Sequence, residues 1–264
     1  MNKQHGLEMF AAKFNKTPQG LGSVRAELSR LLRSMDMVGW NTHEESGRID
    51  RKAFTRFATG SANIFSRRTL EESETSAVSV LVDCSGSMHN EMPVAQAVTI
   101  QLCKLLDNAK ASYCVTGFKN GGGEYFSKQE SGSAKIKELI VETAKFIPFK
   151  QWNEPLLKAA PKLGYMSRMV TGGTPDYAAL FCTVDELRMR PETRKVLFLI
   201  TDASGYNPDN MRHIQLMADK HKIKLVAIGI GRTDVEQCFD NAQNVYSVDD
   251  LGSVAFSKLL KGLK

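Results

Sequence analysis

Short apolar runs rich in β-branched residues alternate with helical stretches over most of this 264-residue chain, and no other feature constrains the fold as strongly. The first run is AVSVLVD at residues 77–83, and four more follow at Tyr113–Phe118, 195–202, 224–230 and Val245–Val248. Runs that are short, continuous and apolar are typical of strands in a parallel sheet that is covered on both faces. The sequence therefore predicts an open, doubly wound α/β domain with a mostly parallel sheet.

Helices are expected between these strands, where apolar residues recur at the spacing of a helical turn. One such stretch carries Ile136 and Ile140 on its inner stripe. A glycine-rich turn at 121–123 is expected to lead into a short edge strand near Tyr125. The five helices are expected at about 93–109, 134–146, 175–190, 209–222 and 249–263.

Residues 1–75 are expected to form a helical N-terminal extension, which leaves residues 76–264 for the α/β domain. Leu28 and Leu32 recur at helical spacing, and a second helix is expected to begin at Asp50, whose carboxylate can cap free backbone N–H groups. The polar sequence EESETS marks the boundary between the two parts.

Charge and cysteine content narrow the classes of function. The 35 basic and 29 acidic residues give a net charge of +6, and no basic tail or stripe concentrates it, so a nucleic-acid partner is not expected. Five cysteines without a C-x-x-C pair fit reduced thiols better than a disulfide framework or a zinc site. No apolar run reaches the roughly 18 residues of a membrane span, and no signal-peptide core is present. We therefore expect a cytoplasmic protein without a membrane partner.

Five oxygen-bearing side chains fall where strands of the predicted sheet end. Asp83, Ser85 and Ser87 follow the first strand, Thr174 lies in a loop just before a helix, and Asp202 ends the strand LFLIT. In an open α/β sheet, ligands bind at the carboxyl ends of the strands. Any one such residue would usually be a local capping group, but the five together predict one site.

Two carboxylates and three hydroxyls suit a hard divalent cation, with Mg²⁺ expected and Mn²⁺ or Ca²⁺ as alternatives. We expect the hydroxyls to bind directly and one or both aspartates to act through water. Because the hydroxyls are neutral, the ion would stay electrophilic at one open position, which a carboxylate from another protein could fill.

These residues resemble the metal-ion-dependent adhesion site of von Willebrand factor A (vWA) domains, with D-x-S-x-S after the first strand, a Gly-Gly-Thr loop and a Thr-Asp at a strand end. The resemblance covers roughly residues 76–264. Within that superfamily, the chain is similar to the vWA domain of the CobT-type subunit of aerobic cobaltochelatase. The narrower similarity, from about residue 45 onward, rests on the passages EESGRIDRKAFTRFATG, VSVLVDCSGSM, PFKQWNEP, GGTPDYAAL, RPETRKVLFLITD and LVAIGIG.

The resemblance implies a partner role rather than autonomous catalysis. CobT-type subunits work with a ring-forming AAA+ ATPase of CobS or MoxR type, and this sequence has no G-x-x-x-x-G-K-[ST] phosphate loop of its own. We expect an adaptor that couples such an ATPase to an acidic client protein. The alternative is a non-catalytic subunit of a chelatase that inserts cobalt or magnesium into a tetrapyrrole.

Two features depart from the CobT pattern. The long acidic N-terminal region of CobT-type subunits is absent, so the short length would fit a phage-encoded or stripped-down relative. The family usually has S-D-G-A-P where this chain has Thr201, Asp202, Ala203, Ser204 and Gly205.

Competing interpretations of single motifs remain open at this point. A hydrolase with Ser85 as nucleophile is disfavoured, because Asp83 stands where a nucleophile elbow needs its first glycine. His213 and His221, eight residues apart on one helix, are expected to be solvated surface residues. Cys84 is expected to be a packed thiol. Trp152, in PFKQWNEP, could fill a groove near the metal site or contact a partner.

Overall fold

The computed structural model describes residues 3–16, 20–33, 39–44, 48–49, 65–69, 76–121, 144–231, 233–253 and 257. The chain divides into two compact units. One unit joins Met1–Leu32 to Thr75–Lys264, and the other is Arg33–Glu74. The first unit therefore includes the N-terminal helices as well as the sheet.

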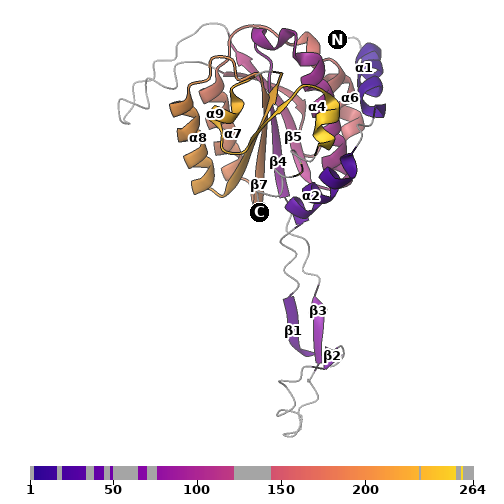
Figure 1. Ribbon diagram of the computed structural model, residues 1–264. Helices are drawn as coiled ribbons and strands as arrows, with labels where there is room; N and C mark the ends of the chain where they lie inside the picture. Colours follow the sequence, from indigo (N-terminus) through magenta and orange to yellow (C-terminus); the bar gives the residue numbers. More distant parts are fainter. Residues whose placement is uncertain are drawn as a thin grey trace. The chain divides into compact units, whose positions relative to one another are not determined.

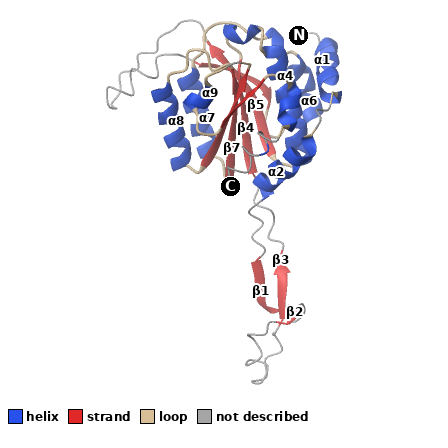
Figure 2. Ribbon diagram, viewed as in Figure 1, coloured by secondary structure: helices blue, strands red, loops and turns tan. Residues whose placement is uncertain are grey.

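The first unit is built on a six-stranded sheet with the order β6-β5-β4-β7-β8-β9, in which β6 is antiparallel to β5 and all other neighbours are parallel. Helices α1, α4 and α6 lie on one face of the sheet, and α7, α8 and α9 lie on the other (Figures 1 and 2). This confirms the doubly wound α/β fold. The strands are β4 (Ser76–Asp83), β5 (Ser112–Asn120), β6 (Ala144–Lys150), β7 (Arg194–Thr201), β8 (Ile223–Ile230) and β9 (Ala242–Val245).

Burial explains why these segments are strands. All eight residues of β4 are buried, as are six of the eight in β7 and seven of the eight in β8. Residues on both faces of these strands contact helices, so both faces must be apolar. In register, Asp83 lies opposite Phe118 of β5, and Val82 lies opposite Ile200 of β7. The carboxyl ends of β4, β5 and β7 thus meet at one edge.

Three helices, α4, α7 and α8, lie close to the expected positions 93–109, 175–190 and 209–222. A proline in the first turn of α4 fixes where that helix begins. Helix α8 begins after Asn207, whose side chain accepts from the backbone N–H groups of Asp209 and Asn210. The helices are α1 (Lys3–Asn15), α2 (Leu21–Arg33), α4 (Met92–Asn108), α6 (Leu156–Gly164), α7 (Asp176–Arg188), α8 (Pro208–Lys220) and α9 (Val235–Cys238), with 3₁₀ turns η2 (Gly86–His89), η3 (Met166–Arg168) and η4 (Val248–Gly252).

Two segments differ from the sequence-based expectation. The helix expected at 134–146 was wrong at its end, because Ala144–Lys150 forms the antiparallel strand β6; residues 134–143 and Tyr125 lie outside the described part. The sequence analysis also missed α6, because Pro161 in its interior argues against a helix. Pro161 has no N–H group to donate to the carbonyl of Leu157. Leu157 is 78% exposed, so this carbonyl is not buried without a hydrogen-bond partner.

The two ends of the chain also differ in detail. The last strand begins three residues earlier than expected, and the expected closing helix starts as η4, with only Ser257 described beyond Ser253. In the second unit, three short strands not anticipated from the sequence form an antiparallel sheet in the order β1-β3-β2. The helix expected from Asp50 lies outside the described residues. The strands are β1 (Gly39–Glu44), β2 (Arg48–Ile49) and β3 (Phe65–Thr69).

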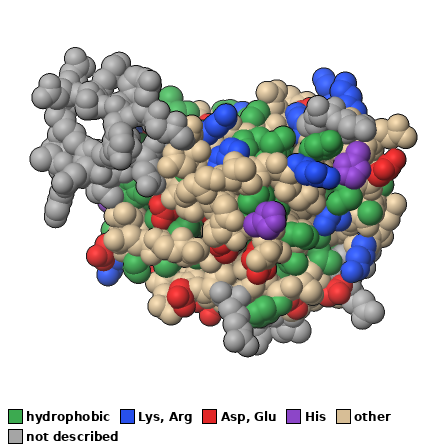
Figure 3. Space-filling view, turned by 90° about the horizontal axis from the view of Figure 1, so that it is seen from above, with side chains coloured by type: hydrophobic (Ala, Val, Ile, Leu, Met, Phe, Trp, Pro, Cys, Tyr) green, Lys and Arg blue, Asp and Glu red, His purple; other side chains and the backbone are tan. Residues whose placement is uncertain are grey.

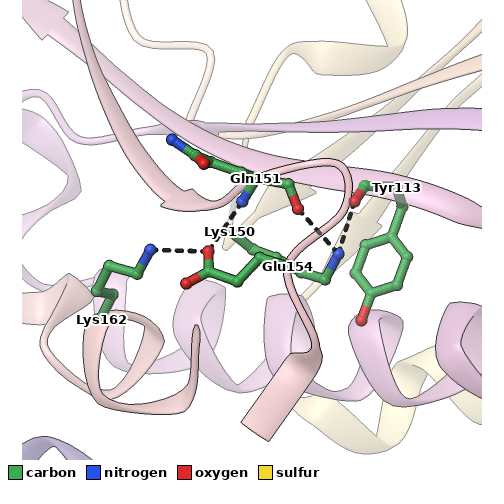
Figure 4. A network of polar contacts seen from close by, with 5 residues as sticks. All are labelled: Tyr113, Lys150, Gln151, Glu154 and Lys162. Carbon is green, nitrogen blue, oxygen red and sulfur yellow. Dashed lines mark hydrogen bonds and ion pairs between the residues drawn. The ribbon is translucent and has the colours of Figure 1, made fainter. Parts of the chain in front are cut away.

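A polar network fixes the turn between β6 and α6 (Figure 4). Lys150 Nζ donates to the carbonyl of Tyr113 at 2.7 Å and to that of Gln151 at 3.2 Å. The Glu154 carboxylate accepts from the backbone N–H of Gln151 at 3.1 Å and from Lys162 Nζ at 2.8 Å. The turn is therefore anchored at both ends to the sheet and to α6.

The N-terminal helix α1 lies directly against α6, and two glycines allow the close approach. A Cβ added to Gly6 would clash with the carbonyl oxygen of Pro161, and one added to Gly164 would clash with the carbonyl oxygen of Gly6. Gln101 Nε2 donates to the carbonyls of Lys13 and Lys16, at the end of α1. Residues 3–16 are thus part of the same core as α4 and α6.

No helix among the described residues is long and apolar enough to span a membrane.

We expect Gly6→Ala to lower the free energy of unfolding by about 1–3 kcal/mol, because the added methyl group pushes α1 away from α6. Gly22→Ala is the matched control, since nothing lies within 4 Å of a Cβ at that position of α2. Urea denaturation of the full chain measures both. Equal midpoints for Gly6→Ala and wild type would contradict the tight contact.

Candidate metal site

Asp83 is the buried centre of the site, at the end of β4. Its Oδ1 accepts from the backbone N–H of Ser85 at 2.8 Å, and its Oδ2 accepts from Thr201 Oγ1 at 3.0 Å. The pKa of Asp83 is raised to about 6, chiefly by burial and also by the charge of Asp202, while the hydrogen bonds from Ser85 and Thr201 oppose the rise. At neutral pH the site therefore holds a buried carboxylate.

The turn after β4 brings two hydroxyls to the same place. Ser85 Oγ and Ser87 Oγ are 3.0 Å apart; Ser85 is buried and Ser87 is exposed. The backbone N–H of Gly86 donates to the carbonyl of Gly172 at 2.8 Å. A Cβ at Gly86 would lie 3.1 Å from that oxygen, so glycine permits the close pairing of the two loops.

Backbone hydrogen bonds hold the loop that carries Thr174 against the turn after β4 and the end of β5. The backbone N–H of Thr171 donates to the Cys84 carbonyl at 3.0 Å, and that of Asn120 donates to the Gly173 carbonyl at 2.9 Å. Thr174 therefore follows two anchored residues and is half-buried just before α7. Within the described part of the chain, its hydroxyl makes no hydrogen bond, so it is available to a ligand.

Asp202 follows β7 directly and is half-buried. Its Oδ1 accepts from the backbone N–H of Ser204 at 3.0 Å. The next residue, Ala203, has φ 50°, a left-handed conformation that is unfavourable for a residue with a Cβ. Ala203 therefore carries local backbone strain beside the site.

All five predicted residues thus lie in turns or loops at the carboxyl edge of the sheet. Direct hydrogen bonds connect Asp83, Ser85 and Ser87, and Asp202 is close enough for its charge to act on Asp83. Among the described residues, no group of three or more His, Cys, Asp or Glu side chains could hold a metal ion. The predicted set itself contains two carboxylates and three hydroxyls.

The donor set fits a hard divalent cation. Asp83 is a buried carboxylate that forms no ion pair with a described basic side chain, and the groups around it are neutral hydroxyls and a second carboxylate. A buried charge without a counter-charge is unfavourable, and a cation held by oxygen ligands removes that cost. The sequence analysis missed Thr201 as a partner of Asp83, although it directly precedes Asp202.

Trp152 does not belong to this edge of the sheet. Its Nε1 donates to Glu186 Oε1 at 3.0 Å, and Arg190 lies over its ring at 4.4 Å. Glu186 is ten residues along α7 from Asp176, which corresponds to about 15 Å. Trp152 instead lines a separate cleft of about 580 Å³.

Two other candidates have structural roles. Cys84 is buried, and burial raises the pKa of its thiol to about 12, so it stays a neutral thiol, as expected. His213 is exposed, and its Nδ1 pairs with the hydroxyl of Tyr177 at 2.9 Å.

The comparison with protein families identifies this architecture. The family described as the VWA domain of the cobalamin biosynthesis protein CobT matches residues 64–263. The chain belongs to the CobT VWA family. The CobT-type VWA domain therefore covers the whole six-stranded sheet and all five site residues. A search of curated proteins found no match.

Solved structures with distant similarity include other vWA proteins. Proximal thread matrix protein 1 of the mussel byssus is 17% identical over 72% of this chain and 46% of its own, with a TM-score of 0.45. A von Willebrand factor type A protein from Catenulispora acidiphila is 15% identical over 72% and 43%, also at 0.45. Manganese-loaded TRAP protein of Plasmodium vivax is 14% identical over 72% and 73%, at 0.48. The chain spans less than half of the first two.

The face of the CobT-type domain that carries the strand ends is seen from above in Figure 3. Acidic, basic and hydrophobic side chains are interspersed on it, and neither sign of charge dominates. Recognition at this face would therefore depend on local groups rather than on a broad electrostatic field.

We expect Asp83→Asn to raise the unfolding temperature of the cation-free protein at pH 7, because the amide avoids a buried charge. The pKa of Asp83 is higher in the folded chain, so its contribution to stability is full below about pH 4 and is lost as the pH rises through about 6. The difference between variant and wild type should therefore grow between pH 4 and 6. Thermal unfolding in EDTA measures it.

Asp219→Asn, an exposed position on α8, is the control and should unfold as wild type does. A cation-free Asp83→Asn protein that is less stable than wild type at pH 7 would contradict the account.

Proposed function

We propose that this chain is a metal-dependent protein-interaction subunit that works with a AAA+ ATPase of CobS or MoxR type. The observation that supports the proposal is the hydrogen-bonded group of Asp83, Ser85 and Ser87 at one edge of a CobT-type VWA domain, where the loops that carry Thr174 and Asp202 also lie. These five residues are the proposed ligands. The proposed cation is Mg²⁺, with Mn²⁺ or Ca²⁺ as alternatives.

A bound cation would supply a Lewis-acidic position for an acidic side chain of the partner. The chain's own residues set up that position in different ways. Asp83 is fixed by hydrogen bonds from Ser85 and Thr201, which hold its carboxylate in one orientation. Ser87 and Thr174 are reachable from solvent and can act as direct ligands. Neutral ligands leave more positive charge on the ion, which favours a partner carboxylate.

Energy for any client reaction would come from the partner. The sequence has no phosphate-binding loop of the G-x-x-x-x-G-K-[ST] type. The acidic client and the ATPase are therefore both proposed as separate proteins.

A chelatase role is the second candidate, and the description of the matching family as a cobalamin biosynthesis protein favours it. In that case this chain would be a non-catalytic subunit of an ATP-driven enzyme that inserts cobalt or magnesium into a tetrapyrrole. The candidate metal site at the carboxyl edge of the sheet would then bind a large tetrapyrrole-binding subunit.

A hydrolase mechanism through Ser85 has no support in the geometry. Ser85 Oγ pairs with Ser87 Oγ, and no described histidine lies within hydrogen-bonding distance of it. A serine nucleophile needs such a base.

We expect Thr174→Val to weaken Mg²⁺ binding at least about tenfold, because it removes a ligand oxygen without changing side-chain size. Thr171→Val is the control from the same loop, since the hydroxyl of Thr171 accepts from Lys119 Nζ instead. Isothermal titration with MgCl₂ measures both. Equal affinities for Thr174→Val and wild type would remove Thr174 from the site.

We expect an affinity pull-down from the source lysate to retain a AAA+ ATPase with the wild-type chain in Mg²⁺, and to lose it with Asp83→Ala or EDTA. Mass spectrometry identifies the protein. A large tetrapyrrole-binding subunit captured alongside the ATPase would favour the chelatase role. Retention of the same ATPase by both wild type and Asp83→Ala, each in Mg²⁺ and in EDTA, would show that the metal site is not the contact.

A further inference from the structure

A groove runs between the edge strand β6 and helix α7. The cleft of about 580 Å³ described above adjoins a second cleft of about 300 Å³, because Thr116, Pro148 and Glu186 line both. Along β6 the lining residues run from Phe146 to Lys150, which is about 14 Å of extended strand. The groove is therefore elongated, and its length suits about five residues of an extended chain.

The two ends of this β6–α7 groove differ in chemistry. Phe146 and Cys182 line one end, and Phe146 keeps 38% of its surface exposed. Trp152 lies at the other end, where its indole N–H donates to Glu186 and the guanidinium of Arg190 covers its ring. Two contacts thus fix the tryptophan ring, and tryptophan and arginine often dominate the energy of binding surfaces. The groove has an apolar end and an aromatic, charged end.

The charge without a partner at the second end is positive. This end is lined by five charged side chains, and three of them are already paired. The partners are Lys162 for Glu154, Glu192 for Arg190, and the indole of Trp152 for Glu186. The other two are Lys150 and Lys158, and neither forms an ion pair with a described side chain. An anionic group is therefore the complementary ligand.

Lys150 is the stronger of these two observations, because it is only 3% exposed. Among the described residues, its ammonium contacts neutral groups: the carbonyls of Tyr113 and Gln151 and the face of the Tyr113 ring, at 3.7 Å from the centroid (Figure 4). A buried charge without a counter-charge is unfavourable. A carboxylate bound in the cleft would supply that counter-charge, and Lys158, which is exposed, would attract it from solvent.

The charged end of the groove lies away from the candidate metal site. Lys150 is opposite Val115 of β5, and Val115 precedes Phe118, the residue level with Asp83, by three positions. That is about 10 Å along the sheet, on a strand that β5 separates from β4. Binding here therefore does not need a cation at Asp83.

We propose that the β6–α7 groove binds an extended acidic segment of a partner protein, with an apolar side chain against Phe146 and an acidic side chain beside Lys150 and Lys158. The two side chains would lie about four residues apart in the segment, to match the groove. The unpaired lysines favour an acidic ligand, and the elongated shape beside an edge strand favours an extended chain over a compact molecule. The inference goes beyond the proposed function, because it requires neither the cation nor the ATPase.

Tryptophan fluorescence gives a direct readout of this groove. The chain has two tryptophans, so Trp40→Phe leaves Trp152 as the only one. The probe is an array of capped six-residue peptides of random sequence, incubated with the full chain in EDTA. Peptides that bind are then titrated into the Trp40→Phe chain, and the emission of Trp152 is recorded.

We expect the bound peptides to carry an aspartate or glutamate about four residues from an apolar residue, and to shift the emission of Trp152. Lys158→Glu should weaken their binding at least about tenfold, because a like charge then faces the acidic side chain. Lys220→Glu is the matched control, an exposed lysine on α8 outside the groove, and should bind as the parent chain does. Added NaCl should weaken binding to the parent chain.

Several results would overturn the proposal. An array without preference for acidic peptides, or acidic peptides that leave the emission of Trp152 unchanged, would exclude the groove as their site. Equal affinities for Lys158→Glu and Lys220→Glu would remove the charge contact. Acetate that shifts the emission as strongly as the peptides would assign the groove to small anions instead. Each of these outcomes would leave the cation site and the proposed function unaffected.

Discussion

The parallel pairing of β4 with β5 and β7 is the constraint on which the rest of the structure depends. It places Asp83 level with Phe118 and one step beyond the pair of Val82 and Ile200, so three strands end at the same edge. The loops that follow then pair through backbone groups, with the amide of Gly86 donating to the carbonyl of Gly172. Without this register the residues of the candidate site would lie on separate surfaces.

The buried charge of the candidate site is unfavourable, and the stability of the rest of the fold compensates for it. Asp83 is fully buried, and its nearest partners are a backbone amide and the Thr201 hydroxyl rather than a basic side chain. Ala203 adds backbone strain at the adjacent position. Buried charge and strained backbone concentrate at functional sites, because only a well-packed core can hold them. Here that core is the covered sheet, in which most residues of β4, β7 and β8 are buried.

The N-terminal segment has a different relation to the domain. The family match begins at residue 64, whereas α1 packs on α6 through the contact of Gly6 with Gly164. Side chains from α4 also take part, because Gln101 and Lys104 donate to carbonyls near the end of α1. A segment outside the family match is thus built into the core of the domain that the family defines.

The sequence by itself determined the class of the fold and the identity of the candidate ligands, because both depend on local pattern. Continuous apolar runs require strands buried on both faces, and oxygen-bearing residues directly after such runs fall at the strand ends. Tertiary structure alone decided the direction of β6, the helix that contains Pro161, and the position of Trp152 away from the metal edge. These outcomes depend on contacts between segments far apart in the chain, and no local pattern of residues encodes which distant groups will share a buried space.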